Sequence, residues 1–152
     1  MTEIHNSHLY VFFVLDGKYF FVPQDDVDSV EIIADVQREN ASDGAIGWFF
    51  GHGDESPVFC LAEDFSLLLD VPKKREYFIL LKAESQPLGI TCDEVENINL
   101  FEDHLDLQDL PFMMKKPGSP ISQLLVYQEQ IGCVCRGPAL VKHLQSLIEQ
   151  NQ

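Results

Sequence analysis

The feature that most constrains the fold of this chain is a pattern that occurs twice. In each copy, two apolar strands joined by a short turn are followed by a third strand that contains an acidic residue. The first copy spans residues 10–15, the turn Asp16-Gly17, and residues 19–22 and 27–30, and the second spans residues 77–81, the turn Ser85-Gln86, and residues 88–90 and 95–98. An Asp-Gly pair between apolar runs is a strong hairpin signal. The duplication predicts two small barrel-like sheets, an architecture used for recognition more often than for catalysis.

The rest of the chain predicts a mainly β protein that ends in a helix. Further strands are expected at residues 46–50, 57–61, 121–128 and 130–135, a short helix at 62–69, and a long acidic loop at 101–119. Pro138 suits a first helical turn, and apolar residues follow at helical spacing, at Leu140, Val141, Leu144, Leu147 and Ile148. We expect one domain over residues 1–152, with one subdomain at about 9–70 plus the C-terminal helix and a second at about 76–135.

The chain is strongly acidic. It carries 25 acidic and 10 basic residues, for a formal net charge of −15. Such a surface repels phosphate backbones and anionic lipids, which argues against nucleic-acid and membrane-surface binding. The apolar run at residues 9–15 is too short for membrane insertion. The charge is either that of an ordinary soluble cytosolic protein, the interpretation we prefer, or a means of attracting a basic partner face. The first eight residues are polar and show no signal-peptide pattern, so a cytoplasmic location with reduced thiols is expected.

The positions of the four cysteines give little support for a catalytic, redox or metal-binding role; they are Cys60, Cys92, Cys133 and Cys135. Cys133 and Cys135 lie two apart on a predicted strand, which suits buried structural thiols better than a metal site or a redox pair. A cysteine hydrolase would use Cys60 as nucleophile and His52 as base. Cys60 lies within an apolar strand, however, so we expect it to be buried and unreactive. No phosphate-binding or dinucleotide-binding motif is present, and no cofactor or metal is expected.

Two features of the loop at 101–119 have more than one interpretation. The acidic cluster lacks the spacing of a calcium loop and is expected to be solvated; it comprises Glu102, Asp103, Asp106 and Asp109. The apolar run Phe112-Met113-Met114 either folds back onto the barrel, which we favour, or contacts another molecule.

The order and spacing of several segments resemble the CheW-like adaptor domain of bacterial chemosensory systems, over about residues 9–148. The similarity lies in the opening hairpin with residues 19–23, Val27 and Val30, in the spacing of Gly47, Gly53, Pro57 and Leu61, and in a second hairpin with Leu88, Gly89, Ile90, Asp93 and Val95. The resemblance implies two five-stranded SH3-like β-barrels with a hydrophobic groove between them. It also implies a non-enzymatic scaffold that couples chemoreceptor tips to a CheA-type histidine kinase.

The chain differs from the family pattern at the central motif. Members commonly read Asn-Leu-Arg-Gly where this chain has Phe50-Gly51-His52-Gly53, and often carry an acidic residue where it has Ser29. Arginine presents a fixed fork of donors that a mostly neutral histidine does not. The resemblance is therefore to a divergent member, which serves either the receptor–kinase complex or a pilus-type or other motility pathway.

The partner-binding residues expected from the resemblance and the apolar pattern are Val27, Val30, Trp48, Phe49, Phe50 and His52. Trp48 and Phe50 share one strand face and Phe49 takes the other, and we expect Trp48 or Phe49 to replace the missing arginine as an exposed anchor. The expected partners are a kinase regulatory domain, a receptor tip or another CheW-like protein. A small-ligand sensor that uses the groove between the barrels and the cysteine hydrolase remain the alternatives.

Overall fold

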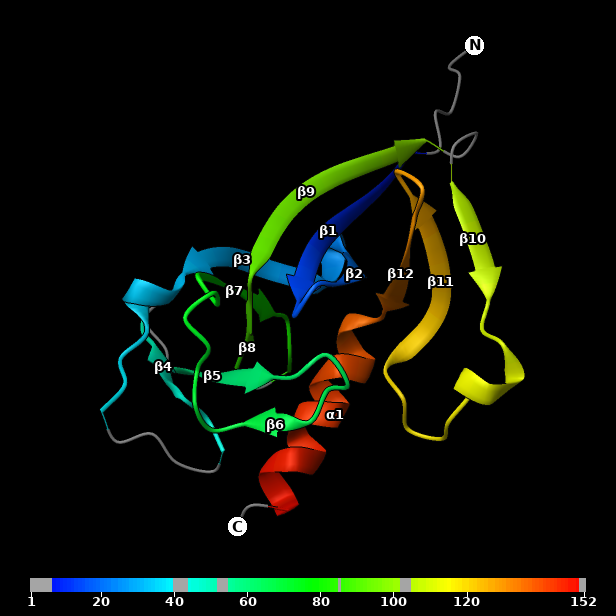
Figure 1. Cartoon of the computed structure of the whole chain (residues 1–152). Coiled ribbons are helices and arrows are strands. Elements are labelled where there is room, and N and C mark those ends of the chain that lie inside the picture. Colours follow the sequence, from blue (N-terminus) through cyan, green and yellow to red (C-terminus); the bar gives the residue numbers. More distant parts are fainter. Residues whose placement is uncertain (1–6, 40–43, 52–54, 85, 102–104, 151–152) are drawn as a thin grey trace.

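The computed structural model describes residues 7–39, 44–51, 55–84, 86–101 and 105–150, which form two curled β-sheets and a C-terminal helix (Figure 1). The strands are β1 (Ser7–Leu15), β2 (Lys18–Pro23), β3 (Val27–Ile32), β4 (Gly47–Phe49), β5 (Ser56–Leu61), β6 (Leu67–Leu68), β7 (Tyr77–Leu81), β8 (Leu88–Cys92), β9 (Glu94–Phe101), β10 (Asp106–Asp109), β11 (Ile121–Tyr127) and β12 (Gln130–Cys135). The 3-10 turns η1 (Gln24–Asp26), η2 (Ile33–Asp35) and η4 (Phe112–Met114) and the helix α1 (Gly137–Gln150) complete these elements. The mainly β fold with a C-terminal helix confirms the expected fold class.

The two copies of the sequence repeat exchange their third strands. The first sheet has the order β10-β11-β12-β2-β1-β9, and the second has the order β3-β7-β8-β5-β4, with β6 paired to β5. The hairpin β1–β2 therefore pairs with β9 of the second copy, and the hairpin β7–β8 pairs with β3 of the first copy. This differs from the expected division at residues 70–76, because each sheet takes strands from both sides of it. Each sheet also holds one short strand beyond the five expected, β10 or β6.

The strand β1 is covered on both faces, which accounts for its unbroken apolar sequence. Val11 and Phe13 point into a core that is shared by both sheets and α1, whereas Tyr10 and Phe12 point into the curl of the first sheet. Its two edges pair with β2 and β9. A strand in this position needs apolar residues at successive positions rather than at alternate ones.

The second sheet closes on itself as a small barrel. Phe78 and Leu80 of β7 belong to its interior. The chain that follows β3, at one end of the sheet order, bonds to β4 at the other end. Trp48 N donates to Gln37 O at 2.8 Å, and Gln37 N donates to Trp48 O at 2.7 Å. This bridge links the chain after β3 to β4, and so the short strand β4 is held in place by backbone bonds on both sides.

The helix α1 packs between the two sheets. Leu140 and Leu144 are buried in the shared core, so this side of the expected groove is filled. Gly137 N donates to Asp26 Oδ2 at 2.9 Å, and this carboxylate complements the positive N-terminal end of the helix. A Cβ atom on Gly137 would lie 2.4 Å from Asp26 Cβ, which explains the glycine. Among the described residues, no helix is long and apolar enough to cross a membrane.

The short helix expected at residues 62–69 is replaced by a turn and by β6. Phe65 adopts a left-handed conformation, with φ of 66°. Ser66 N and Ser66 Oγ both donate to Asp64 Oδ1, at 3.0 Å and 2.6 Å. An aspartate that binds the backbone two residues ahead competes with helix formation, and here the chain turns back to pair β6 with β5.

The acidic loop expected at residues 101–119 contains a strand. Leu105 and Leu107 are half-buried and pack against the interior of the first sheet, so one side of this segment faces inward. Asp106 and Asp109 are exposed, as expected for solvated acids. Glu102 and Asp103 lie outside the described residues.

Candidate functional site

The strand β3 carries exposed apolar side chains on one face. Val30 is exposed and Ile32 is 50% exposed, and their spacing of two places them on the same side of the strand. Val27 is half-buried and packs against the shared core. It therefore holds β3 in place and offers little area to a partner. Ile32 was not among the partner-binding residues expected from the sequence, although its spacing of two from Val30 indicates that both side chains lie on the same side of the strand.

The three aromatic residues around the end of β4 lie in different environments. Phe49 is buried, and its ring packs edge-on against Phe78 with centroids 5.3 Å apart. Trp48 is half-buried, and Phe50 is 50% exposed. The expectation that Phe49 could be an exposed anchor is therefore wrong, because strand alternation turns this ring into the barrel interior. Phe50 is the aromatic residue of this group that a partner can reach most fully.

The end of β4 and β3 meet at an open pocket of about 410 Å³, lined by Glu31, Asp35, Gln37, Phe49, Phe50 and Gly51. We call Phe50 and the pocket beside it the β3–β4 surface, whereas Val30 and Ile32 lie on the opposite face of β3 from Glu31. Glu31 and Asp35 make its surroundings acidic. His52, at the position of the family's arginine, lies outside the described residues, and its role in binding remains a prediction.

A second apolar projection lies at the opposite end of the molecule, in residues 111–116, which we call the Phe112 turn (Figure 1). Phe112 is 90% exposed and Met113 is 87% exposed, whereas Met114 packs against the shared core. The preferred expectation, that this run folds back onto the barrel, is right for Met114 and wrong for the other two. The exposed Lys115 and Lys116 follow, so this projection is basic where the β3–β4 surface is acidic.

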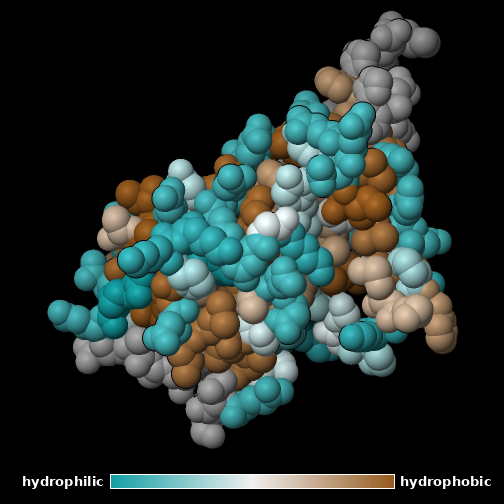
Figure 2. Space-filling model, in the orientation of Figure 1, coloured by the Kyte–Doolittle hydropathy of each residue, from teal (hydrophilic) through white to brown (hydrophobic). Residues whose placement is uncertain are grey.

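The two apolar regions are separated by polar surface. In Figure 2, hydrophobic areas lie toward both sides of the visible face, with a largely hydrophilic band between them. The strands at the two sides belong to different sheets, β3 and β4 on one side and β10 and β11 on the other. Two partners could therefore bind without sharing a contact surface.

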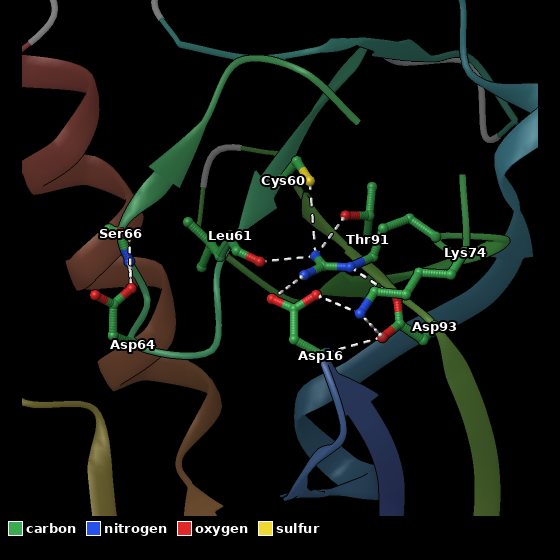
Figure 3. A network of polar contacts seen from close by, with 9 residues as sticks. Asp16, Cys60, Leu61, Asp64, Ser66, Lys74, Thr91 and Asp93 are labelled. Carbon is green, nitrogen blue, oxygen red and sulfur yellow. Dashed lines mark hydrogen bonds and ion pairs between the residues drawn. The ribbon is translucent and has the colours of Figure 1, made fainter. Parts of the chain in front are cut away.

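Asp16, Lys74, Arg75 and Asp93 form an ion cluster around the buried Arg75 (Figure 3). Arg75 is 1% exposed, and its Nη2 lies 3.0 Å from Asp16 Oδ2 while its Nε lies 2.8 Å from Asp93 Oδ1. Its Nη1 donates to Leu61 O at 2.7 Å. Lys74 Nζ approaches Asp16 Oδ1 at 2.9 Å, and this contact is the main reason why the pKa of Asp16 is lowered.

The ion cluster joins the two sheets. Asp16 follows β1 of the first sheet, Asp93 lies between β8 and β9, and the Leu61 carbonyl belongs to β5 of the second sheet. Asp16 N donates to Asp93 Oδ2, and Asp93 N donates to Val14 O, both at 2.8 Å. The cluster therefore fixes where the hairpin β1–β2 meets the second sheet, and sequence reasoning did not identify it.

The cysteines are free and buried, as expected. Arg75 Nη1 donates to Cys60 Sγ at 3.6 Å, yet burial dominates and raises the pKa of the Cys60 thiol. Burial also raises the pKa of Cys92 to about 12. A nucleophilic cysteine needs solvent access and a lowered pKa, so this geometry does not support Cys60 as a hydrolase nucleophile. Its expected base, His52, lies outside the described residues.

Other ligand chemistry finds little support in the described part of the chain. There, no group of three or more His, Cys, Asp or Glu side chains is placed to hold a metal ion. Two wide, open pockets, of about 640 Å³ and 580 Å³, have charged walls that include Lys74, Glu76, Lys82 and Lys142. Small-ligand sites are usually enclosed and mainly apolar, so these pockets differ from the site that a sensor would need.

Comparisons with known proteins agree with this architecture. The family model of the CheW-like domain matches residues 9–145. The crystal structure of the scaffolding protein TtCheW from Thermoanaerobacter tengcongensis has a TM-score of 0.63 and 18% sequence identity, and the match covers 84% of this chain and 88% of that chain. At this identity the likeness shows the fold. No curated protein matches the chain in sequence.

The match to the family runs from β1 into α1 and so includes both sheets. It spans the exchanged strands, the ion cluster and both exposed apolar regions. The chain belongs to the CheW-like domain family, whose members are non-enzymatic scaffold proteins of chemotaxis signalling.

Proposed function

We propose that this chain is a cytoplasmic, non-enzymatic adaptor that connects two partners of a bacterial chemosensory pathway. One partner is the regulatory domain of a CheA-type histidine kinase, and the other is a chemoreceptor tip or another CheW-like protein, or their counterparts in a pilus or motility pathway. The observation that carries the proposal is the pair of exposed apolar surfaces at opposite ends of the molecule, the β3–β4 surface and the Phe112 turn. An adaptor of this kind needs two separate anchors on one rigid body.

Each surface offers one exposed phenylalanine as a central anchor. Phe50 follows the bridged strand β4, and Phe112 precedes Met114, which fixes the turn to the core. Aromatic side chains held in place by the fold can bury a large apolar area at a small entropic cost. Burial of one phenylalanine side chain contributes roughly 1.5–3 kcal/mol.

The charges around the two anchors favour different partners. Glu31 and Asp35 beside Phe50 favour a basic partner face, whereas Lys115 and Lys116 beside Phe112 favour an acidic one. The two surfaces also complement each other between molecules, which supports another CheW-like protein as a partner. Charge thus selects the partner while the aromatic anchor supplies most of the affinity.

The proposal is tested by calorimetric titration of the purified chain against a kinase regulatory domain and a receptor-tip fragment. We expect Phe50→Ala and Phe112→Ala each to weaken binding of one partner by about tenfold or more and to leave the other partner unaffected. Leu69→Ala is the matched control, because Leu69 is also exposed and apolar but belongs to neither surface. Equal losses with Leu69→Ala, or no loss with either phenylalanine variant, would contradict the proposal.

The contribution of His52 is measured in the same titration. Protonated histidine is a minority form at neutral pH, since its reference pKa is about 6.5. We therefore expect His52→Ala to reduce binding less than Phe50→Ala does. A larger loss with His52→Ala would assign the anchor to the position of the family's arginine.

A further inference from the structure

The strand β9 forms one border of the first sheet, and its outer edge has no strand partner in the described part of the chain (Figure 1). It pairs with β1 from Ser7↔Phe101 to Val14↔Glu94 without a register shift. A regular border strand presents every second backbone N–H and C=O group outward. The backbone of β9 is therefore arranged to hydrogen-bond with an added strand.

The other sheet borders carry features that obstruct such pairing. The strand β10 has four residues, two of which are aspartates. The strand β3 contains two acidic residues and a register shift between Val27 and Ser29, and β4 has three residues and is bridged to Gln37. Natural proteins commonly protect borders by shortness, charge or bulges.

The second half of β9 has none of these protections. Residues 97–101, Asn-Ile-Asn-Leu-Phe, contain no charged residue, no proline and no bulge. Phe101 is exposed, and Leu9 is exposed on the same face, since Leu9 lies opposite Asn99 in the register. In a chain with a net charge of −15, this uncharged border with apolar side chains is unusual.

The first half of β9 determines which strand fits. Glu94 and Glu96 are exposed on one face of β9 and Phe101 on the other, so an incoming strand meets two carboxylates on the first face and an apolar ring farther along on the second. We propose that β9 binds an extended peptide segment of a partner protein by strand addition. The segment is basic beside Glu94 and Glu96 and apolar beside Phe101. In strand addition, hydrogen bonds between the two backbones provide the affinity, and the side chains provide the specificity.

A second copy of the chain fits this border less well. Pairing of two β9 strands would bring together two molecules that each carry a net charge of −15. A basic segment is attracted by the same charge that keeps two copies apart. The binding mode uses neither the β3–β4 surface nor the Phe112 turn, and so it is independent of the proposed adaptor function.

A fluorescently labelled peptide, Lys-Thr-Lys-Val-Thr-Val-Thr-Val, tests the proposal by anisotropy titration of the full chain. We expect saturable binding that weakens as salt is raised. Replacing Glu94 and Glu96 together by glutamine should lower the affinity by about three- to tenfold. The matched double variant Glu63→Gln with Glu149→Gln removes two exposed carboxylates elsewhere and should leave the affinity unchanged.

Two further measurements identify the binding mode. Methylation of alternate peptide nitrogens along one edge of the peptide should abolish binding, whereas methylation along the other edge should not, because an added strand pairs through one edge only. Hydrogen exchange should show new protection at alternate amides of β9. The variants Phe50→Ala and Phe112→Ala should bind the peptide as the unaltered chain does.

Several results would overturn the proposal. These are no binding at peptide concentrations up to about 1 mM, equal effects of methylation on both edges, or protection confined to other strands. Concentration-dependent association of the chain alone, with protection at residues 97–101, would show that the occupant is a second copy and not a basic peptide.

Discussion

The ion cluster and the Phe112 turn both depart from the usual distribution of side chains, in which charged groups are exposed and apolar groups are buried. In the ion cluster a guanidinium is almost completely buried, whereas in the Phe112 turn a phenylalanine and a methionine are almost completely exposed. Buried charges and exposed apolar groups are the informative exceptions in a globular protein. The comparison suggests that charge fixes the internal geometry of this molecule while apolar side chains provide its external contacts.

The burial of Arg75 is tolerated because ion-pair and hydrogen-bond partners surround its guanidinium. Two carboxylates and the Leu61 carbonyl surround the guanidinium, and Thr91 Oγ1 lies 3.4 Å from Nη1. These contacts gather groups from both sheets around one guanidinium. The apolar atoms of the Phe112 turn have no comparable constraint and can adapt to a partner surface.

The largest expected effect comes from removing the buried cation. Arg75→Met removes the nearest cation from the more buried Asp93 and one of two cations from Asp16, and we expect it to lower the free energy of unfolding by about 3–5 kcal/mol. Urea denaturation followed by circular dichroism measures this change. Lys74→Met is the control, since Lys74 belongs to the same cluster but is exposed, and its effect should be much smaller. Equal effects would show that burial is not what makes the arginine important.

A smaller effect separates the two parts of the Phe112 turn. Met114→Ala should lower the free energy of unfolding by roughly 1–2 kcal/mol, because Met114 packs against the shared core. Phe112→Ala should change it by less than about 0.5 kcal/mol, because this side chain is exposed in the free protein. The comparison is made by urea denaturation without a partner. A large loss with Phe112→Ala would mean that the residue serves folding instead of binding.

The smallest expected effect is the pH dependence contributed by Asp16. Its hydrogen bond with Lys74 lowers the pKa of this carboxyl below the ordinary value of 3.8. A group with a lowered folded-state pKa stabilises the fold above its unfolded pKa and loses that contribution as the pH falls through the folded value. We expect Asp16→Asn to be less stable than the unaltered chain at pH 7 and to lose less stability than that chain between about pH 4 and pH 2.

Urea denaturation at a series of pH values checks this prediction. The control is Asp25→Asn, which changes an exposed carboxyl that lies outside the ion cluster. A parallel loss of stability in Asp16→Asn and in the unaltered chain below pH 4 would show that this carboxylate is not coupled to folding.

Much of the local structure was predictable from the sequence. The Asp16-Gly17 turn and its flanking apolar runs predicted the hairpin β1–β2, and the helical spacing after Pro138 predicted α1. The apolar neighbours of Cys60 predicted its burial. These features depend on turn chemistry and on the period of the side chains, which are properties of neighbouring residues.

The candidate site was predictable only in part. The sequence identified residues 48–50 and Val30, and it identified the apolar run at 112–114 as a contact in one of two interpretations. It could not decide that Phe50 faces solvent while Phe49 faces the barrel, or that Met114 alone anchors its turn. Both outcomes depend on which side of a strand or turn the rest of the molecule covers.

The sequence by itself determined the repeated hairpins, the acidic surface, the terminal helix and the resemblance to the CheW-like family. The tertiary structure decided that the two copies exchange β3 and β9, and that Arg75 meets two carboxylates distant in sequence. The physical reason is that strand edges offer the same backbone groups whatever their side chains are. Which edge pairs with which is therefore settled by the cores that form around β1 and β7, through contacts between residues far apart in the chain.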